Sequence, residues 1–178
     1  MSYNKSLIYL SGSIESKKDL GNIWRREIIA LAEPTFSGYS FYNPCDEDPP
    51  LLYEVYPDKK TFFNSKTTSD GQPSQDFKDI VTAMINHDID KMYEETVAVI
   101  LMYENVMSWG SAGEITLAQF LSIPVVTINA TGSINDVPGW VIGCSNVIVN
   151  DMESALVEVK QRLEWAIDED KFFQMSET

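Results

Sequence analysis

The run TVAVILMY at residues 96–103 is the feature that most limits how this chain can fold. It is apolar at consecutive rather than alternate positions and rich in β-branched residues, which indicates a strand buried on both faces. Such a strand belongs to a parallel sheet, because each parallel crossover lays a helix over one face. Helical periodicity precedes the run from residue 74 and follows it over residues 111–122, as this arrangement requires.

The rest of the chain repeats the alternation of short apolar strands and amphipathic helices. Further strands are predicted at 7–13, 39–44, 123–128 and 145–150, and further helices at 19–33 and from residue 152 onward. The segment 46–73 breaks the pattern. It is too long for an ordinary loop, and its aromatic residues favour a lid or a subunit contact. We expect a single α/β domain over residues 1–178: a three-layer sandwich with a parallel five-stranded sheet, helices on both faces and this insertion.

The formal net charge of −14 limits the partners of the chain. Proteins that bind nucleic-acid polymers or anionic membrane surfaces carry clusters of Lys and Arg, and this chain has no such cluster. Small molecules or proteins therefore remain as partners. The acidic surface could also serve solubility alone. No apolar run approaches the roughly 20 residues of a membrane span and no leader precedes Leu7, so we expect a cytoplasmic protein. Cys45 and Cys144 are too few for a metal knuckle, and we expect no metal and no cofactor.

The stretch SWGSAGE at residues 108–114 joins the central strand to the next predicted helix. Ligands of open parallel sheets bind beyond the carboxyl ends of the strands, so this turn is a candidate site. We predict Glu114 in the first turn of its helix, where free N–H groups and the helix dipole favour an ionised carboxylate. The small residues at 110–113 would let a ligand approach the backbone closely. The alternative is an ordinary acidic helix start.

Asp88 interrupts the apolar stripe of the helix that begins near residue 74. The stripe consists of Phe77, Ile80, Val81, Met84, Ile85, Ile89 and Met92. Asp88 lies on this inward face, whereas Asp90 lies on the solvated face, so the Asp88 carboxylate must find a partner or a ligand. The alternative is a core aspartate that caps a loop. Tyr9, in the first strand, could extend its hydroxyl to the same edge of the sheet, or could be a plain core tyrosine.

Taken together, the motifs resemble the nucleoside 2-deoxyribosyltransferase family, including the related deoxynucleoside-monophosphate N-glycosidases. They are IYLSGS at 8–13, an NxD pattern ending at Asp88, SxGxxxE ending at Glu114, and EITLAQFLSIPVVTI from residue 114 onward. The resemblance covers roughly residues 7–43 and 85–150. It implies a flavodoxin-like or Rossmann-like fold and a homo-oligomer, dimeric or higher, with sites near the subunit contacts.

By this resemblance, Glu114 is the nucleophile that attacks C1′ of a 2′-deoxynucleoside and holds the sugar as an ester. Asp88 manages the proton of the departing and returning base, and Tyr9 keeps the nucleophile aimed. The chemistry agrees with that of retaining glycosidases, in which two carboxyl groups act on an oxocarbenium-like centre. A second free nucleobase that attacks the ester gives transfer, and water gives hydrolysis. The implied partners are a deoxynucleoside or deoxynucleotide and a free nucleobase.

The candidates for substrate binding follow the strands or come from the resemblance, and they are Gly12, Ser13, Asn43, Ser108, Gly110 and Trp140. Ser108 stands six positions before Glu114. The resemblance implies an aspartate at this position in the transferases, where it contacts the sugar 5′-hydroxyl, and a serine near the 5′-phosphate in the monophosphate N-glycosidases. The GSI segment at 12–14 is also similar to that of the hydrolases, but Glu15 stands where they have a basic residue. Trp140 resembles a family position close to the neighbouring subunit's site.

Three functions stay open on the sequence alone. The first is a transferase that exchanges bases on deoxynucleosides, and the second is an N-hydrolase that releases the base from deoxynucleoside 5′-monophosphates. The third is a non-catalytic nucleotide-binding or sensor protein, which the long insertion suggests. We favour the transferase, because Tyr9, Asp88 and Glu114 follow the family pattern jointly.

Overall fold

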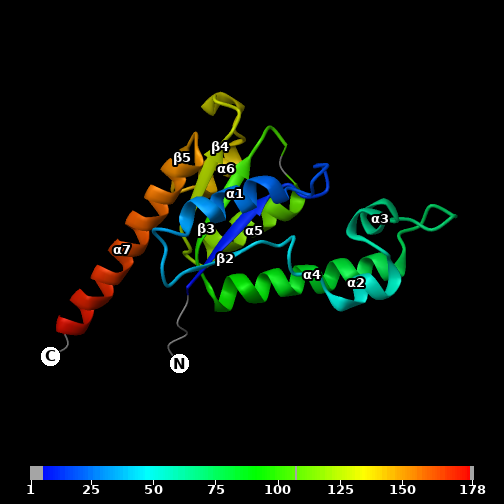
Figure 1. The fold of residues 1–178 in the computed structure, drawn as a ribbon, viewed down its shortest axis with the longest axis horizontal. Coiled ribbons are helices and arrows are strands. Elements are labelled where there is room, and N and C mark those ends of the chain that lie inside the picture. The colour runs from blue at the N-terminus through cyan, green and yellow to red at the C-terminus, as the bar shows by residue number, and fades with distance from the viewer. Residues whose placement is uncertain (1–5, 107, 177–178) are drawn as a thin grey trace.

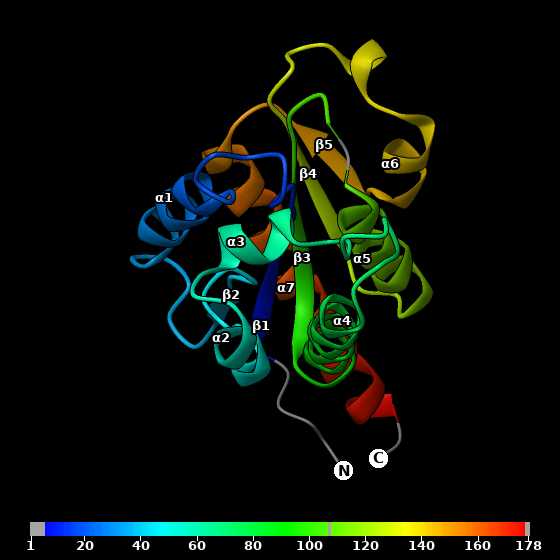
Figure 2. The ribbon, with the colours of Figure 1, turned by 90° about the vertical axis from the view of Figure 1, so that its right-hand side faces the viewer.

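The computed structural model describes residues 6–106 and 108–176 and places a five-stranded sheet between two layers of helices (Figures 1 and 2). The strand order is β2-β1-β3-β4-β5, and every neighbouring pair is parallel. The sequence-based prediction of a flavodoxin-like or Rossmann-like α/β sandwich is therefore confirmed. Within the two described ranges, no helix combines the length and the apolar character needed to cross a membrane.

The elements alternate along the chain as parallel crossovers require. The strands are β1 (Leu7–Gly12), β2 (Ser40–Tyr42), β3 (Thr96–Tyr103), β4 (Val125–Asn129) and β5 (Val147–Val149). The helices are α1 (Asn22–Ala32), α2 (Pro50–Val55), α3 (Lys59–Asn64), α4 (Gln75–Glu94), α5 (Trp109–Phe120), α6 (Gly139–Cys144) and α7 (Met152–Ser176), with a 3₁₀ turn η1 (Ile134–Asp136).

Each face of the sheet has its own hydrophobic core. On one face, α1 and α7 bury Ile28 and Val159 against β1 and β3. On the other face, α4, α5 and α6 bury residues such as Met92 and Ile115 against the same strands. Figure 2 shows this division, with α1 on one side of the sheet and α5 and α6 on the other. Because β3 lies at the centre and is covered on both sides, its residues from Ala98 to Tyr103 are all buried.

The insertion at 46–73, for which the sequence predicted a lid or a subunit contact, contains two short helices. It forms α2 and α3, which pack on the part of α4 that lies far from the sheet (Figure 1). Leu52, Phe62 and Ile80 form a small third core there, and the Phe62 and Phe77 rings stack with centroids 4.6 Å apart. Aromatic residues in the insertion therefore serve its own packing against α4.

The chain between β4 and β5 also differs from the prediction, because it contains η1 and α6. Helix α6 has 6 residues, which is too short for a helical period to stand out in the sequence. It nevertheless buries Val141 against the core on the α5 side of the sheet.

A fully buried arginine holds the carboxyl end of β1. Arg25 donates from Nε to the Leu10 carbonyl at 3.1 Å, from Nη1 to the Gly21 carbonyl at 2.8 Å and from Nη2 to the Gly12 carbonyl at 2.9 Å. Its guanidinium carbon lies 4.6 Å from the centre of the Trp24 ring. Gly21 has a φ of 73°, and a Cβ there would lie 2.5 Å from Arg25 Nη1, so this position requires glycine.

We expect Arg25→Met to lower the free energy of unfolding by about 3 kcal/mol, because it leaves buried carbonyl groups without donors. Chemical denaturation followed by circular dichroism measures the change. The neighbouring Arg26 is exposed and serves as the matched control, since Arg26→Met should change stability by less than about 0.5 kcal/mol. Equal effects of the two substitutions would contradict a structural role of the Arg25 hydrogen bonds.

Candidate active site

Glu114 lies on α5 and is held by two side chains of β1. The Tyr9 hydroxyl donates to Glu114 Oε1 at 3.1 Å, and the Ser11 hydroxyl donates to Oε2 at 2.5 Å. Tyr9 and Ser11 are two positions apart on one strand, so their side chains point to the same face of the sheet. Both oxygens of the Glu114 carboxyl group are therefore oriented by the end of β1.

Asp88 lies on α4 and is held in the same way from the neighbouring strand. The Tyr42 hydroxyl donates to Asp88 Oδ1 at 2.8 Å. Tyr42 is the last residue of β2 and pairs in register with Tyr9, and the two rings have centroids 5.0 Å apart. The structure thus brings Glu114, Tyr9, Tyr42 and Asp88 together in one network. Asp88 and Glu114 are both only partly buried, whereas the two tyrosines are buried.

Burial raises the pKa of both carboxyl groups, and the charge of Asp88 raises that of Glu114 further. The pKa of Glu114 rises from 4.5 to about 7, first through lost solvation and then through the charge of Asp88, against the hydrogen bond of Ser11 and the charge of Arg25. Burial also raises the pKa of Asp88, against the hydroxyl groups of Tyr42 and Tyr9. A pair of carboxyl groups that holds a proton near neutral pH can supply both a nucleophile and an acid.

The tyrosines remain protonated donors in this network. Burial raises the pKa of both phenols above the ordinary value of 10.0, and the neighbouring carboxylates raise it further. For Tyr9 the larger of these charges is that of Glu114, and for Tyr42 it is that of Asp88. Each phenol therefore stays available to stabilise a carboxylate across the physiological pH range.

The predicted position of Glu114 in the first helical turn is wrong. Helix α5 begins earlier than predicted, at Trp109, because the Ser108 hydroxyl caps it by accepting from the Ser111 N–H at 3.0 Å. Glu114 therefore lies in the second turn, beyond the free N–H groups. Its pKa is raised rather than lowered, so burial outweighs the helix dipole that was expected to ionise it.

The substrate-binding candidates near β1 and β2 have structural partners. Ser13 donates to the Val106 carbonyl at 3.0 Å and thereby joins the two loops above the sheet. Asn43 is buried and donates from Nδ2 to Asn22 Oδ1 and to Asp46 Oδ2. A Cβ at Gly12 would lie 3.0 Å from Trp24. These residues shape the carboxyl edge of β1 and β2 beside the network.

Trp140 lies on the outer side of α5, whereas Gly110 lies one turn before Glu114 on the same helix. Trp140 is 62% exposed, and its Nε1 donates to Thr116 Oγ1 at 3.0 Å on the outer side of α5. A Cβ at Gly110 would have only the Ser108 hydroxyl within 4 Å, at 3.7 Å. A Cβ at Gly113 would meet nothing within 4 Å.

Sequence reasoning missed Ser11, Tyr42 and Arg25 as members of the site. Ser11 was visible as the residue two positions after Tyr9, on the same face of the predicted strand. Tyr42 stands near the end of the predicted second strand, at the edge where ligands bind. Arg25 has no comparable signal, because a charged residue beside an apolar helix position is ordinarily solvated.

Ion pairs surround the edge of the sheet near the network. Lys17 pairs with Glu104 at 2.6 Å, and Lys66, which follows α3, pairs with Glu15 in the loop after β1. Within the insertion, Lys59 pairs with Asp48 at 2.5 Å, and it also donates to the Pro44 carbonyl after β2 at 3.3 Å and lowers the pKa of Asp88 by its charge. The insertion therefore borders the site as well as packing on α4.

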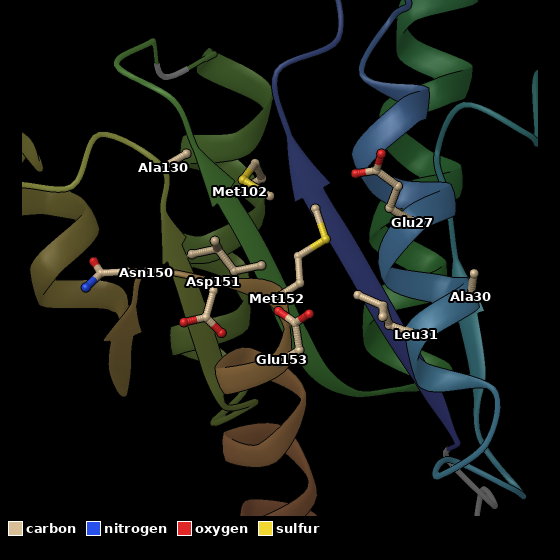
Figure 3. Close-up of a pocket in the computed structure, with 10 residues that line it drawn as sticks. Glu27, Ala30, Leu31, Met102, Ala130, Asn150, Asp151, Met152 and Glu153 are labelled. Carbon is tan, nitrogen blue, oxygen red and sulfur yellow. The ribbon is translucent and has the colours of Figure 1, made fainter.

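A hollow of about 660 Å³ lies on the opposite face of the sheet, between α1 and α7 (Figure 3). Leu31, Met102 and Met152 form its apolar part, and Glu27 and Glu153 point toward it from the two helices. It does not include Glu114 or Asp88. The candidate site is therefore identified by its hydrogen-bonded carboxyl groups and not by the volume of this hollow.

Among the residues that the structure describes, no cluster of His, Cys, Asp and Glu could hold a metal ion.

We expect Glu114→Gln to stabilise the protein in a pH-dependent way. Folding raises the Glu114 pKa, so the wild type loses stability as pH rises from about 4.5 through about 7. The variant escapes this loss and should gain about 2 kcal/mol at pH 8 after allowance for partial exposure, with little gain at about pH 5. Urea unfolding at both pH values measures the gain, and a gain that does not depend on pH would contradict the raised pKa.

Comparisons with known proteins agree with the fold. No family model and no curated protein matches the chain. The structure is similar to the crystal structure of a conserved protein from Enterococcus faecalis V583, with a TM-score of 0.55 and 17% sequence identity. The superposition covers 89% of this chain and 99% of that chain. At this identity the similarity establishes the α/β architecture, and the chemistry must be argued from the site.

Proposed function

We propose that the protein is a nucleoside 2-deoxyribosyltransferase, which cleaves the N-glycosidic bond of a 2′-deoxynucleoside and passes the sugar to another nucleobase. One observation carries the proposal: the adjacent tyrosines Tyr9 and Tyr42, whose rings are in tilted contact, join the carboxyl groups of Glu114 and Asp88. Two such groups, partly exposed and coupled in their protonation, are what displacement at an anomeric carbon needs. The motif resemblance supports the same assignment independently.

In the first half of the reaction, an ionised Glu114 oxygen attacks C1′ as the bond from C1′ to the base nitrogen breaks. The bonding electron pair leaves with the base, and Asp88, with its raised pKa, supplies a proton to the base. Tyr9 and Ser11 hold the Glu114 carboxylate in one orientation, which lowers the entropic cost of attack. The product of this step is a deoxyribosyl ester of Glu114 and a free base.

In the second half, a nitrogen of another nucleobase attacks C1′ of the ester. The electron pair of the ester bond returns to the Glu114 carboxylate, and Asp88 accepts the proton that the incoming base loses. Tyr9 and Ser11 are then again the donors to the released carboxylate. Water in place of the base completes hydrolysis by the same route.

The charges near the site favour a substrate without a 5′-phosphate. Lys17 and Lys66 are each paired with a carboxylate, and Glu15 adds negative charge to the loop after β1. The Ser108 hydroxyl is engaged as the cap of α5 and contacts the Ser111 hydroxyl at 2.9 Å. A phosphate would have to displace these partners, whereas a neutral 5′-hydroxyl would not. This supports deoxynucleosides over deoxynucleotides.

Brief exposure to a deoxynucleoside should add the mass of one dehydrated deoxyribose to the intact protein. Glu114→Gln should abolish the adduct, because an amide oxygen is a poor nucleophile, and Tyr9→Phe should slow its formation about 10- to 100-fold through loss of a hydrogen bond to a charged group. Rapid-quench mass spectrometry measures both. Glu153→Gln, on the opposite face, is the control. An adduct that persists in Glu114→Gln would eliminate Glu114 as the nucleophile.

Incubation with a deoxynucleoside and a different free base should give the new nucleoside, detected by chromatography. We expect a higher kcat/KM for deoxynucleosides than for their 5′-monophosphates, because the nearby lysines are already paired. Base release from monophosphates alone would instead assign the N-hydrolase reaction. Ligand-dependent thermal stabilisation without turnover of either substrate would reject catalysis and leave a binding protein.

A further inference from the structure

Tyr42 is a buried polar residue that takes no step in either half of the proposed reaction. Its side chain is 3% exposed, and its hydroxyl donates to Asp88 Oδ1 at 2.8 Å. Burial raises the Tyr42 pKa and the charge of Asp88 raises it further, so the phenol keeps its proton at physiological pH. Tyr42 can therefore donate to Asp88 throughout a reaction cycle, although it does not itself exchange a proton with a nucleobase.

The Tyr42 ring is held from several sides, which fixes the direction of its hydroxyl. Its centroid lies 5.0 Å from that of the Tyr9 ring and 6.0 Å from that of the His87 ring. Lys91 Nζ lies 5.9 Å from the same centroid. The backbone that follows is anchored as well, because Asn43 is buried and its side chain is hydrogen-bonded. A donor held in this way can orient a more mobile acceptor.

Asp88 is the more mobile acceptor. Its side chain on α4 is only partly buried, so packing alone does not confine the carboxyl group. The Tyr9 hydroxyl has a single proton, and its hydrogen bond at 3.1 Å is to Glu114 Oε1. The bond from Tyr42 therefore holds Asp88 while Tyr9 serves the nucleophile.

The groups around Asp88 also set how readily it loses its proton. Burial raises the pKa of Asp88, and the hydrogen bond from Tyr42 is the largest influence that opposes burial. Other nearby groups lower this pKa less, and they are Tyr9 on β1, His87 on α4 and Lys59 on α3. Glu114 faces Asp88 from α5, and the charge of Asp88 raises the Glu114 pKa. Tyr42 thus makes Asp88 a stronger acid than its buried position alone would allow.

We propose that Tyr42 is a positioning residue that holds Asp88 by Oδ1, so that Oδ2 carries the proton to and from the nucleobase. The inference rests on the proposed function, since it concerns the acid and base of that reaction. In the first half, Oδ2 gives its proton to the base nitrogen that takes the electron pair of the bond to C1′, and Asp88 becomes a carboxylate. The bond from Tyr42 strengthens as this charge develops, which favours departure of the base. In the second half, Oδ2 takes the proton that the incoming base loses.

Tyr42→Phe tests the proposal, because it deletes the hydroxyl and keeps the ring contacts. With 2′-deoxyadenosine or thymidine, the single-turnover rate of ester formation should fall about 10-fold, since Asp88 loses a hydrogen bond to its charged form. Tyr42 lowers the Asp88 pKa, so without it Asp88 keeps its proton to a higher pH. The alkaline limb of the pH–rate profile should therefore move to higher pH. Rapid-quench mass spectrometry over a range of pH values measures both effects, and a purely structural defect would lower the rate without moving the limb.

Tyr39→Phe is the matched control, since Tyr39 precedes β2 at the end away from the carboxyl pair and should leave the rate and the pH profile unchanged. Thermal melting verifies that both variants are folded. A double-mutant cycle with Asp88→Asn shows whether Tyr42 acts through Asp88, because an amide cannot carry the proton. In the Asp88→Asn background, Tyr42→Phe should lower the rate of ester formation by less than about 2-fold.

An alkaline limb that Tyr42→Phe leaves unmoved overturns the proposal, whatever the rate. A loss that persists at full size in the Asp88→Asn background also overturns it, because Tyr42 would then act on the substrate or on the fold directly. Failure of the wild type to form an ester with either nucleoside is a different result: it rejects the proposed function, and the role of Tyr42 in that reaction is rejected with it.

Discussion

The hydrogen bonds that Tyr9 and Ser11 donate to Glu114 tie the end of β1 to α5, and the candidate site depends on them. A carboxylate that loses solvation is costly unless donors replace the water it gives up. Here the replacement is incomplete, since the pKa of Glu114 still rises to about 7. The ionised form of Glu114 therefore costs stability in the folded protein, and this cost appears as pH rises through about 7.

The position of those donors is fixed from the other side of the sheet. Arg25 binds the carbonyls of Leu10 and Gly12, the two neighbours of Ser11, while the Ser11 side chain reaches Glu114. The charge of Arg25 also opposes the rise in the Glu114 pKa. One buried cation therefore contributes to the shape of the strand end and to the electrostatics of the carboxyl pair.

Helix α5 has two unlike faces. Glu114 and Ile115 face the sheet, whereas Trp109 and Phe120 face outward with Gly113 between them along the helix. A Cβ at Gly113 would meet nothing within 4 Å, so this part of the outer face is open. The aromatic residues of the insertion build a third core on α4.

The sequence by itself determined the α/β class and the positions of the five strands, because these follow from local periodicity. The joint candidacy of Tyr9, Asp88 and Glu114 came from the resemblance of their motifs to a known family. Only the tertiary structure decided which hydroxyl meets which carboxyl group, since the pairing of Tyr42 with Asp88 and of Ser11 with Glu114 joins segments distant in sequence. It also decided the start of α5 and the direction of the Glu114 pKa, because a capping contact and burial depend on neighbours that no local pattern specifies.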